Sequence, residues 1–120
     1  MRIVFPTDEA EGQFSRRGAH FGKAKYYTIV TLENNVITGV QTNKNQGHSG
    51  ACGGAVSNIM ALEPDALVVS GIGGSPAQGF SDAGLDLYFD QTSPTVEMSV
   101  NMLISGKLKK LKGKGTCSGH

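Results

Sequence analysis

The stretch Ala66-Leu-Val-Val-Ser-Gly-Ile-Gly-Gly-Ser-Pro-Ala-Gln78 decides the fold of this chain. Its first five residues form a short continuous apolar run, which is typical of a strand buried on both faces of a parallel sheet. A glycine-rich turn follows. Ser75, Pro76 and Gln78 then have the pattern of a helix start, with Ser at the N-cap, Pro at the first helical position and Gln at the third. A buried strand that leads through a tight turn into a helix indicates an α/β protein.

The remaining elements extend this unit on both sides. Periodicity and turn residues predict five strands, which are 2–6, 25–33, 36–42, 66–70 and 85–89, and three helices, which are 51–63, 75–84 and 93–106. Asn34-Asn35 tolerates positive φ and predicts a hairpin between the second and third strands. The order β-ββ-αβαβα therefore predicts an α/β fold with a mixed five-stranded sheet and about three helices. The hairpin lies at one side of that sheet and the parallel strands at the other.

Length and composition indicate one globular domain. The chain has 120 residues, of which 38% are hydrophobic and 18% charged, and no apolar run approaches the roughly 20 residues that span a bilayer. We predict a single domain over residues 1–111 and a flexible Lys/Gly-rich tail over 112–120. The start Met-Arg-Ile-Val-Phe has the pattern of a strand rather than of a signal peptide, so we expect a cytoplasmic protein with reduced cysteines and no membrane partner.

The charge of the chain argues against a nucleic-acid partner. The formal net charge is only +1, although five lysines, Lys107, Lys109, Lys110, Lys112 and Lys114, crowd the C-terminal end. Such a run is most simply a solvated helix end followed by a tail. A docking surface for an acidic partner or an anionic cluster is the alternative.

Two short Gly/Ser-rich segments carry most of the metal-binding chemistry. They are His48-Ser-Gly-Ala-Cys52 and Cys117-Ser-Gly-His120, which hold both cysteines and two of the three histidines. Thiolate and imidazole bind soft or borderline metals and iron–sulfur species, and small flanking residues let the backbone approach a bulky group. His48, Cys52, Cys117 and His120 are therefore candidate metal ligands.

Each of these ligands also has a structural interpretation. Cys52 shares a helical face with Val56 and Ile59 and could simply pack there, although the first helical turn also lowers a thiol's pKa and favours the thiolate. Cys117 and His120 end the chain in a segment that could fold over a site or do nothing. Cys52 with a histidine could also act as a nucleophile and base in a Cys-dependent redox or transfer enzyme, but nothing in the sequence supplies a substrate pocket.

The glycine-rich turn Gly71-Ile-Gly73-Gly74-Ser75 is a candidate cofactor-binding element. Pro76 occupies the place of the third glycine of a dinucleotide fingerprint. Phe80 occupies the place of the P-loop lysine, so we do not expect the turn to bind ATP or GTP. Exposed amides at a helix N-terminus remain, which suit an anion or an anionic metal cluster. A small anion-binding module, or a tight turn without a ligand, would have the same sequence.

Several segments together resemble the dinitrogenase iron–molybdenum cofactor biosynthesis family. They are Met1-Arg-Ile-Val-Phe5, His20-Phe-Gly-Lys-Ala-Lys-Tyr-Tyr27, Asp65-Ala-Leu-Val-Val-Ser-Gly-Ile-Gly73 and Gly84-Leu-Asp-Leu-Tyr88, with a closing helix that ends in Gly106-Lys-Leu. The resemblance covers roughly residues 1 to 111. Its most specific parts are the His-Phe-Gly segment and the Gly-Ile-Gly turn.

The resemblance implies a ribonuclease H-like α/β fold without nuclease activity. It also implies non-catalytic binding or delivery of an iron–sulfur or iron–molybdenum type cluster, with metallocluster donor or acceptor proteins as partners. His20, which spacing alone favours as a structural histidine at a strand entrance, becomes a candidate ligand through the resemblance. His48, Cys52, Cys117 and His120 depend on their chemistry alone.

Overall fold

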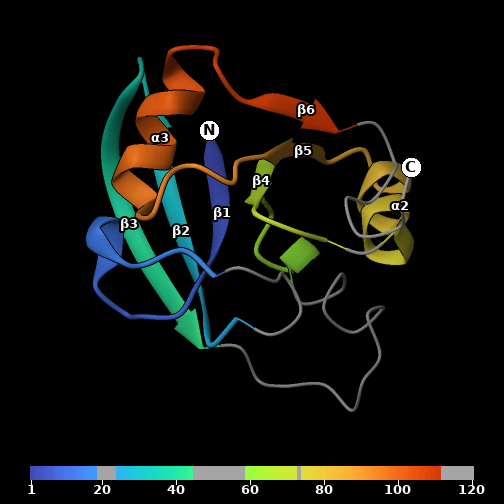
Figure 1. Ribbon diagram of the computed structural model, residues 1–120, viewed down its shortest axis with the longest axis horizontal. Helices are drawn as coiled ribbons and strands as arrows, with labels where there is room; N and C mark the ends of the chain where they lie inside the picture. The colour runs from blue at the N-terminus through green and yellow to red at the C-terminus, as the bar shows by residue number, and fades with distance from the viewer. Residues whose placement is uncertain (19–23, 45–58, 73, 112–120) are drawn as a thin grey trace.

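The structure is a computed structural model that describes residues 1–18, 24–44, 59–72 and 74–111 (Figure 1). Its strands form one sheet in the order β3-β2-β1-β4-β5-β6. The strands are β1 (Arg2–Thr7), β2 (Tyr26–Glu33), β3 (Val36–Lys44), β4 (Ala66–Val69), β5 (Asp86–Phe89) and β6 (Lys109–Leu111). The helices with described bounds are the 3-10 helix η1 (Gly12–Phe14) and the α-helices α2 (Gly74–Asp82) and α3 (Val96–Ile104).

The sheet is mixed, as the sequence predicts. β1, β4 and β5 are parallel to one another, and β2 pairs antiparallel with both β1 and β3. The hairpin thus lies at one side of the sheet and the parallel strands towards the other. The mixed α/β architecture is confirmed.

The prediction of five strands is wrong, because β6 is a sixth strand. It pairs antiparallel with β5 from Phe89↔Lys109 to Leu87↔Leu111. Its lysines lack the apolar alternation that usually marks a strand. An edge strand does not need this alternation, because backbone hydrogen bonds to its one neighbour hold it in the sheet. Charged side chains on an edge strand also discourage pairing with another chain. Lys110 Nζ also lies 2.9 Å from Asp86 Oδ1 across the pair.

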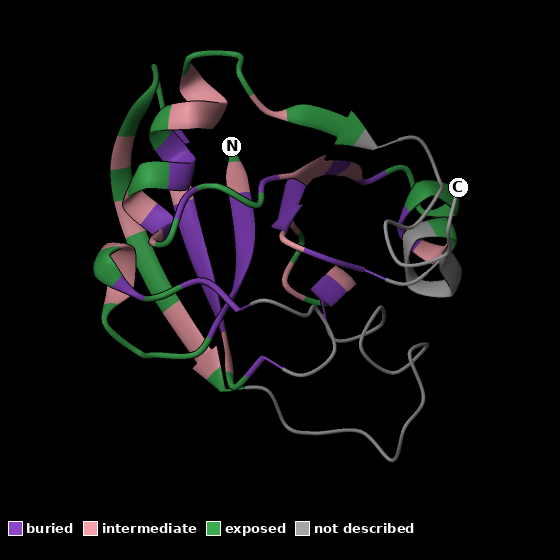
Figure 2. Cartoon of the chain, viewed as in Figure 1, coloured by how far each residue is buried: buried purple, intermediate pink, exposed green. Residues whose placement is uncertain are grey.

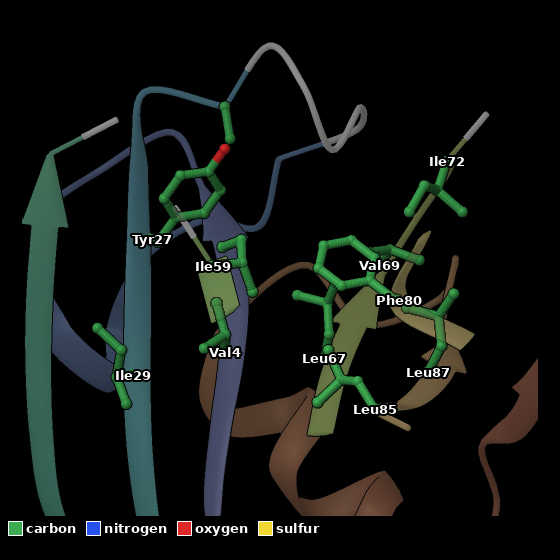
Figure 3. Packing of buried hydrophobic residues seen from close by; sticks show 11 residues of the cluster. Val4, Tyr27, Ile29, Ile59, Leu67, Val69, Ile72, Phe80, Leu85 and Leu87 are labelled. Carbon is green, nitrogen blue, oxygen red and sulfur yellow. The ribbon is translucent and has the colours of Figure 1, made fainter. Parts of the chain in front are cut away.

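Apolar residues cover both faces of the sheet. One cluster gathers side chains from β1, β2, β4 and β5 with Ile59, Ile72 and Phe80, and Figure 3 shows them pointing towards one another. The second cluster lies on the other face, under Val96 and Val100 of α3. Neighbouring residues of β4 alternate between the two clusters, so all four are buried. Figure 2 shows the consequence: β1, β2 and β4 are largely buried, β5 is mostly intermediate, and the edge strands β3 and β6 carry exposed residues.

Turn residues act as the sequence predicts. Asn34 and Asn35 have φ of 54° and 64° and connect β2 to β3, as a type I′ hairpin turn requires. Gly84 (φ 80°) and Gly106 (φ 71°) follow the ends of α2 and α3.

Both of these glycines close a Schellman motif. After α2, the Gly84 N–H donates to the carbonyl of Ser81 and the Leu85 N–H donates to that of Phe80. Leu85 and Phe80 also lie in the same apolar cluster, which is the hydrophobic contact that accompanies this motif.

Two predicted helix starts are displaced. α2 begins at Gly74, so Ser75 lies in its first turn instead of at the N-cap. α3 begins at Val96 and not at Ser93-Pro94, because Thr95 is the N-cap and its Oγ1 accepts a hydrogen bond from Met98 N. Ser93 instead forms hydrogen bonds with Asp90 and Arg17.

The first predicted helix, 51–63, falls mostly outside the described residues. Ile59 and Met60 are helical, and a turn at residues 61 and 62 ends the segment. Glu63 has φ of 54°, immediately before Pro64. In the described part of the chain there are thus two α-helices with defined bounds, fewer than the three predicted, and none of the described helices is long and apolar enough to cross a membrane.

Candidate functional site

Four strands end at one edge of the sheet, which we call the carboxyl edge. It is formed by the last residues of β1, β3, β4 and β5, namely Thr7, Lys44, Val69 and Phe89. The register brings them together, because Thr7 pairs with Tyr26, Tyr26 pairs with Lys44, and Val69 pairs with Phe89. In α/β sheets, ligands bind beyond the carboxyl ends of the parallel strands.

The predicted metal ligands lie outside the described residues. This holds for His20, His48, Cys52, Cys117 and His120. Among the residues that are described, no group of three or more His, Cys, Asp or Glu side chains is placed to hold a metal ion. The five ligand assignments therefore remain predictions.

The described neighbours of two of these segments lie at the carboxyl edge. The Gly18 N–H donates to the carbonyl of Pro6 in β1 at 2.8 Å, and a Cβ on Gly18 would lie 3.3 Å from the Ala24 side chain. Residues 19–23, which include His20, thus connect two points at this edge. Lys44, which precedes residues 45–58, ends β3 there.

The predicted anion-binding turn is described only in part. Gly71 is buried and lies two residues after the end of β4, and Gly74 and Ser75 form the start of α2. Gly73 lies outside the described residues. The turn connects β4 to α2 at the carboxyl edge, as expected from the sequence, and its role as a ligand cradle remains a prediction.

A buried ion pair lies at the carboxyl edge, between the loop after β1 and the loop after β5. Arg17 Nη1 donates hydrogen bonds to the carbonyl oxygens of Asp90 (2.8 Å) and Ser93 (3.0 Å) and lies 3.7 Å from Asp90 Oδ2. The exposed fractions of the two side chains are 2% for Arg17 and 1% for Asp90. The Arg17 backbone joins the same network, because its N–H donates to the carbonyl of Pro94.

The Asp90 carboxylate collects donors from three other residues. Its Oδ1 accepts hydrogen bonds from Thr92 N (2.9 Å), Thr92 Oγ1 (3.0 Å) and Ser93 N (3.2 Å). Its Oδ2 accepts one from Ser99 Oγ in α3 (2.8 Å). Asp90 therefore ties the end of β5 to the first turns of α3 and to Arg17.

These contacts keep Asp90 ionised. Burial by itself raises its pKa, but hydrogen bonds from Ser93, Thr92 and Ser99 and the charge of Arg17 outweigh it, so the pKa falls to about 2. Burial lowers the pKa of Arg17, while Asp90 opposes that shift. Arginine stays protonated in proteins, so the pair is charged at neutral pH.

A pocket of about 510 Å³ opens beside this pair. Its lining residues come from the loop after β1, the end of β4 and the loop before α3, and they are Arg16, Arg17, Ser70, Gln91, Ser93 and Pro94. Gln91 Nε2 donates to the carbonyl of Ser70 at 3.3 Å and so connects the ends of β4 and β5 across the pocket. The arrangement is a polar, positively charged hollow at the carboxyl edge.

Sequence reasoning missed this site. In the sequence, Asp90 belongs to no group of carboxylates with metal-binding spacing, and Arg16 and Arg17 lie in a loop without helical or strand periodicity. The one available signal was that two of the three arginines of the chain are adjacent in a segment that follows a buried strand.

Comparison with known proteins decides the family. The model of the dinitrogenase iron-molybdenum cofactor family matches residues 1–106. The chain belongs to this family. The resemblance inferred from the sequence segments is therefore confirmed.

Several known proteins are similar to this chain over most of its length. A curated but uncharacterized protein of Methanocaldococcus jannaschii is 27% identical over 115 residues, which are 93% of this chain and 92% of that protein. The apo form of the orange protein from Desulfovibrio gigas has a TM-score of 0.82 at 20% identity, with 94% of each chain covered. A candidate dinitrogenase of Methanocaldococcus jannaschii has a TM-score of 0.74 at 18% identity, with 92% of this chain and 94% of that chain covered. At these identities, the structural likenesses show a common fold.

Proposed function

We propose that this chain binds or delivers an iron–molybdenum or iron–sulfur type metallocluster and catalyses no reaction itself. The observation that carries the proposal is the match of the dinitrogenase iron-molybdenum cofactor model to residues 1–106. The partners would be proteins that donate the cluster or accept it, in the cytoplasm, where thiols stay reduced. We also retain the ribonuclease H-like assignment of the α/β fold as part of this proposal.

The topology supports a site at the carboxyl edge. Gly18, Ala24 and Lys44 lie there, and they flank the segments that hold His20, His48 and Cys52. Gly71 and the start of α2 follow β4 at the same edge. We therefore propose that His20, His48 and Cys52 supply the ligands. The amides of the turn from Gly71 to Ser75 would face an anionic cluster.

Replacing the anchor thiol tests this proposal. Cys52→Ser exchanges a thiolate for a much weaker soft-metal ligand of almost the same size. We expect the variant, purified without oxygen, to lose its iron and its visible absorption but to remain folded, with the melting temperature of the wild-type protein stripped of metal, because a group bound to the native state raises that temperature. Cys117→Ser tests the other candidate thiol: metal loss in both variants would assign Cys117 as a ligand too, and metal loss in Cys52→Ser alone would leave Cys52 as the anchor.

The opposite pattern would assign Cys52 to the core. A hydroxyl in place of a packed thiol lowers the stability by roughly 1 to 3 kcal/mol. A Cys52→Ser protein that melts earlier but keeps the metal content of the wild type would therefore refute the ligand role of Cys52.

A further inference from the structure

Three of the five N–H donors of the Arg17 guanidinium have no acceptor in the described structure. Nη1 donates to two carbonyl oxygens, those of Asp90 and Ser93. Nε and Nη2 are buried, and neither has a hydrogen-bond partner in the described structure. The N–H of Nε and one N–H of Nη2 are parallel. Together they form a fork that can donate two hydrogen bonds to two oxygens of one carboxylate or phosphate.

No carboxylate side chain of the chain is available to fill this fork. All ten Asp and Glu residues are among the described residues, and the stretches that are not described, 19–23, 45–58, 73 and 112–120, contain none. Asp90, the one carboxylate within 4.0 Å of the Arg17 guanidinium in the described structure, approaches Nη1 rather than the fork. A buried donor without an acceptor is destabilising, so the geometry favours an acceptor from outside the chain.

The pocket beside Arg17 has the charge and the polar groups that suit such an acceptor. None of its lining residues is acidic, and Arg16, which is exposed, forms no ion pair with any residue of the described ranges. Ser70, Gln91 and Ser93 add polar groups around the opening. Both Asp90 oxygens already accept hydrogen bonds from groups of the chain, and these donors largely offset the repulsion that the Asp90 charge would exert on an anion in the pocket.

We propose that this pocket binds a tetrahedral oxoanion of the phosphate class, with the Nε/Nη2 fork of Arg17 as its anchor and Arg16 as a second positive charge. The volume of about 510 Å³ admits either a free oxoanion or the phosphate group of a small organic molecule. Because Nε and Nη2 are buried, binding must move the atoms that cover them. The proposal does not depend on a metallocluster.

Titration of the full-length protein with inorganic phosphate tests this site directly. At constant ionic strength with chloride as the balancing anion, we expect saturable binding by calorimetry and a shift of the Arg17 Nε–H resonance. Phenyl phosphate forms the second arm: tighter binding of the ester than of inorganic phosphate would identify an organic phosphate as the source. Tighter binding of the free ion would identify the inorganic oxoanion.

Two variants assign the binding to this pocket. Arg17→Lys keeps the charge but removes the fork, and we expect roughly tenfold or greater loss of phosphate affinity. Arg2→Lys is the matched control, because Arg2 also has a buried Nε without a hydrogen-bond partner in the described structure but does not line the pocket.

A surface variant covers the case in which Arg17→Lys fails to fold. Gln91→Glu adds a negative charge at the exposed rim without touching the core, and it should weaken phosphate binding strongly while the protein remains folded. The absence of saturable phosphate and phenyl phosphate binding by the wild type would overturn the proposal. Binding that is unchanged in the Gln91→Glu variant would also overturn it.

Discussion

A single aspartate, Asp90, joins the loop after β1 to the segment that runs from the end of β5 to the first turn of α3. Its carboxylate accepts hydrogen bonds from Thr92, Ser93 and Ser99, and it lies 3.7 Å from Arg17 Nη1. Nothing in the residue types or spacing predicts this network, because Arg17 lies 73 positions from Asp90 and 76 positions from Ser93. Ser93 shows the effect on local structure. Its N–H donates to Asp90 and its carbonyl accepts from Arg17, and the N-cap of α3 is Thr95 instead of Ser93.

Neutralising Asp90 should therefore destabilise the protein. Asp90→Asn leaves the buried Arg17 charge uncompensated. It also places the amide NH₂ group against N–H and O–H donors that now bind a carboxylate oxygen. We therefore expect a loss of about 3 kcal/mol in the free energy of unfolding. Asp86→Asn is the matched control on β5, where the ion pair with Lys110 is half exposed and contributes little. Urea unfolding of both variants measures the difference. Equal stabilities would show that the Asp90 network does not support the fold.

The same residue predicts an acid dependence. The pKa of Asp90 is depressed to about 2 in the folded state, so its contribution is fully present above the unfolded value of about 4 and is lost as the pH falls towards 2. A shift of this size corresponds to roughly 2 kcal/mol. The stability difference between wild type and Asp90→Asn, measured by urea unfolding at pH 5 and pH 2.5, should shrink at the lower pH. A constant difference would contradict the assignment.

At the scale of secondary-structure elements, local sequence patterns were reliable where backbone geometry limits the choice of residue. The hairpin at Asn34-Asn35 and the helix ends at Gly84 and Gly106 were predicted, because few residues adopt positive φ readily. β6 was not predicted, since a lysine-rich edge strand is defined by pairing with β5 and not by its own periodicity. Long-range pairing of this kind leaves no local pattern.

Replacing Gly84 with alanine tests how much free energy a positive φ costs a residue with a side chain. A Cβ at Gly84 would meet nothing within 4 Å, so the cost of Gly84→Ala comes from the backbone alone and should be about 1 kcal/mol. Gly39→Ala is the control, because its Cβ would make an ordinary contact with Thr31 at 3.8 Å and Gly39 does not have positive φ. Thermal unfolding compares the two. A Gly84→Ala protein as stable as the Gly39→Ala protein would contradict the left-handed turn.

At the scale of the whole molecule, the sequence predicted the family and the mixed sheet but not the polar pocket at the carboxyl edge. Family segments and strand patterns are local, and both were confirmed. The pocket combines Arg17, Ser70 and Gln91 from three loops, which only the folded sheet brings together. For the predicted cysteine and histidine ligands the situation is the opposite. Their metal-binding chemistry is evident in the sequence, but these residues lie outside the part of the chain that the structure describes.

The most direct test of the account is the metal content of the wild-type protein. The chain should be purified without oxygen from cells supplied with iron and molybdate, and its metals and visible absorption should be measured together. We expect iron, with or without molybdenum, in stoichiometric amount and a visible absorption band that disappears on chelation while the fold persists. A colourless protein without iron or molybdenum, which also fails to take up a cluster from a donor protein, would contradict the proposed function.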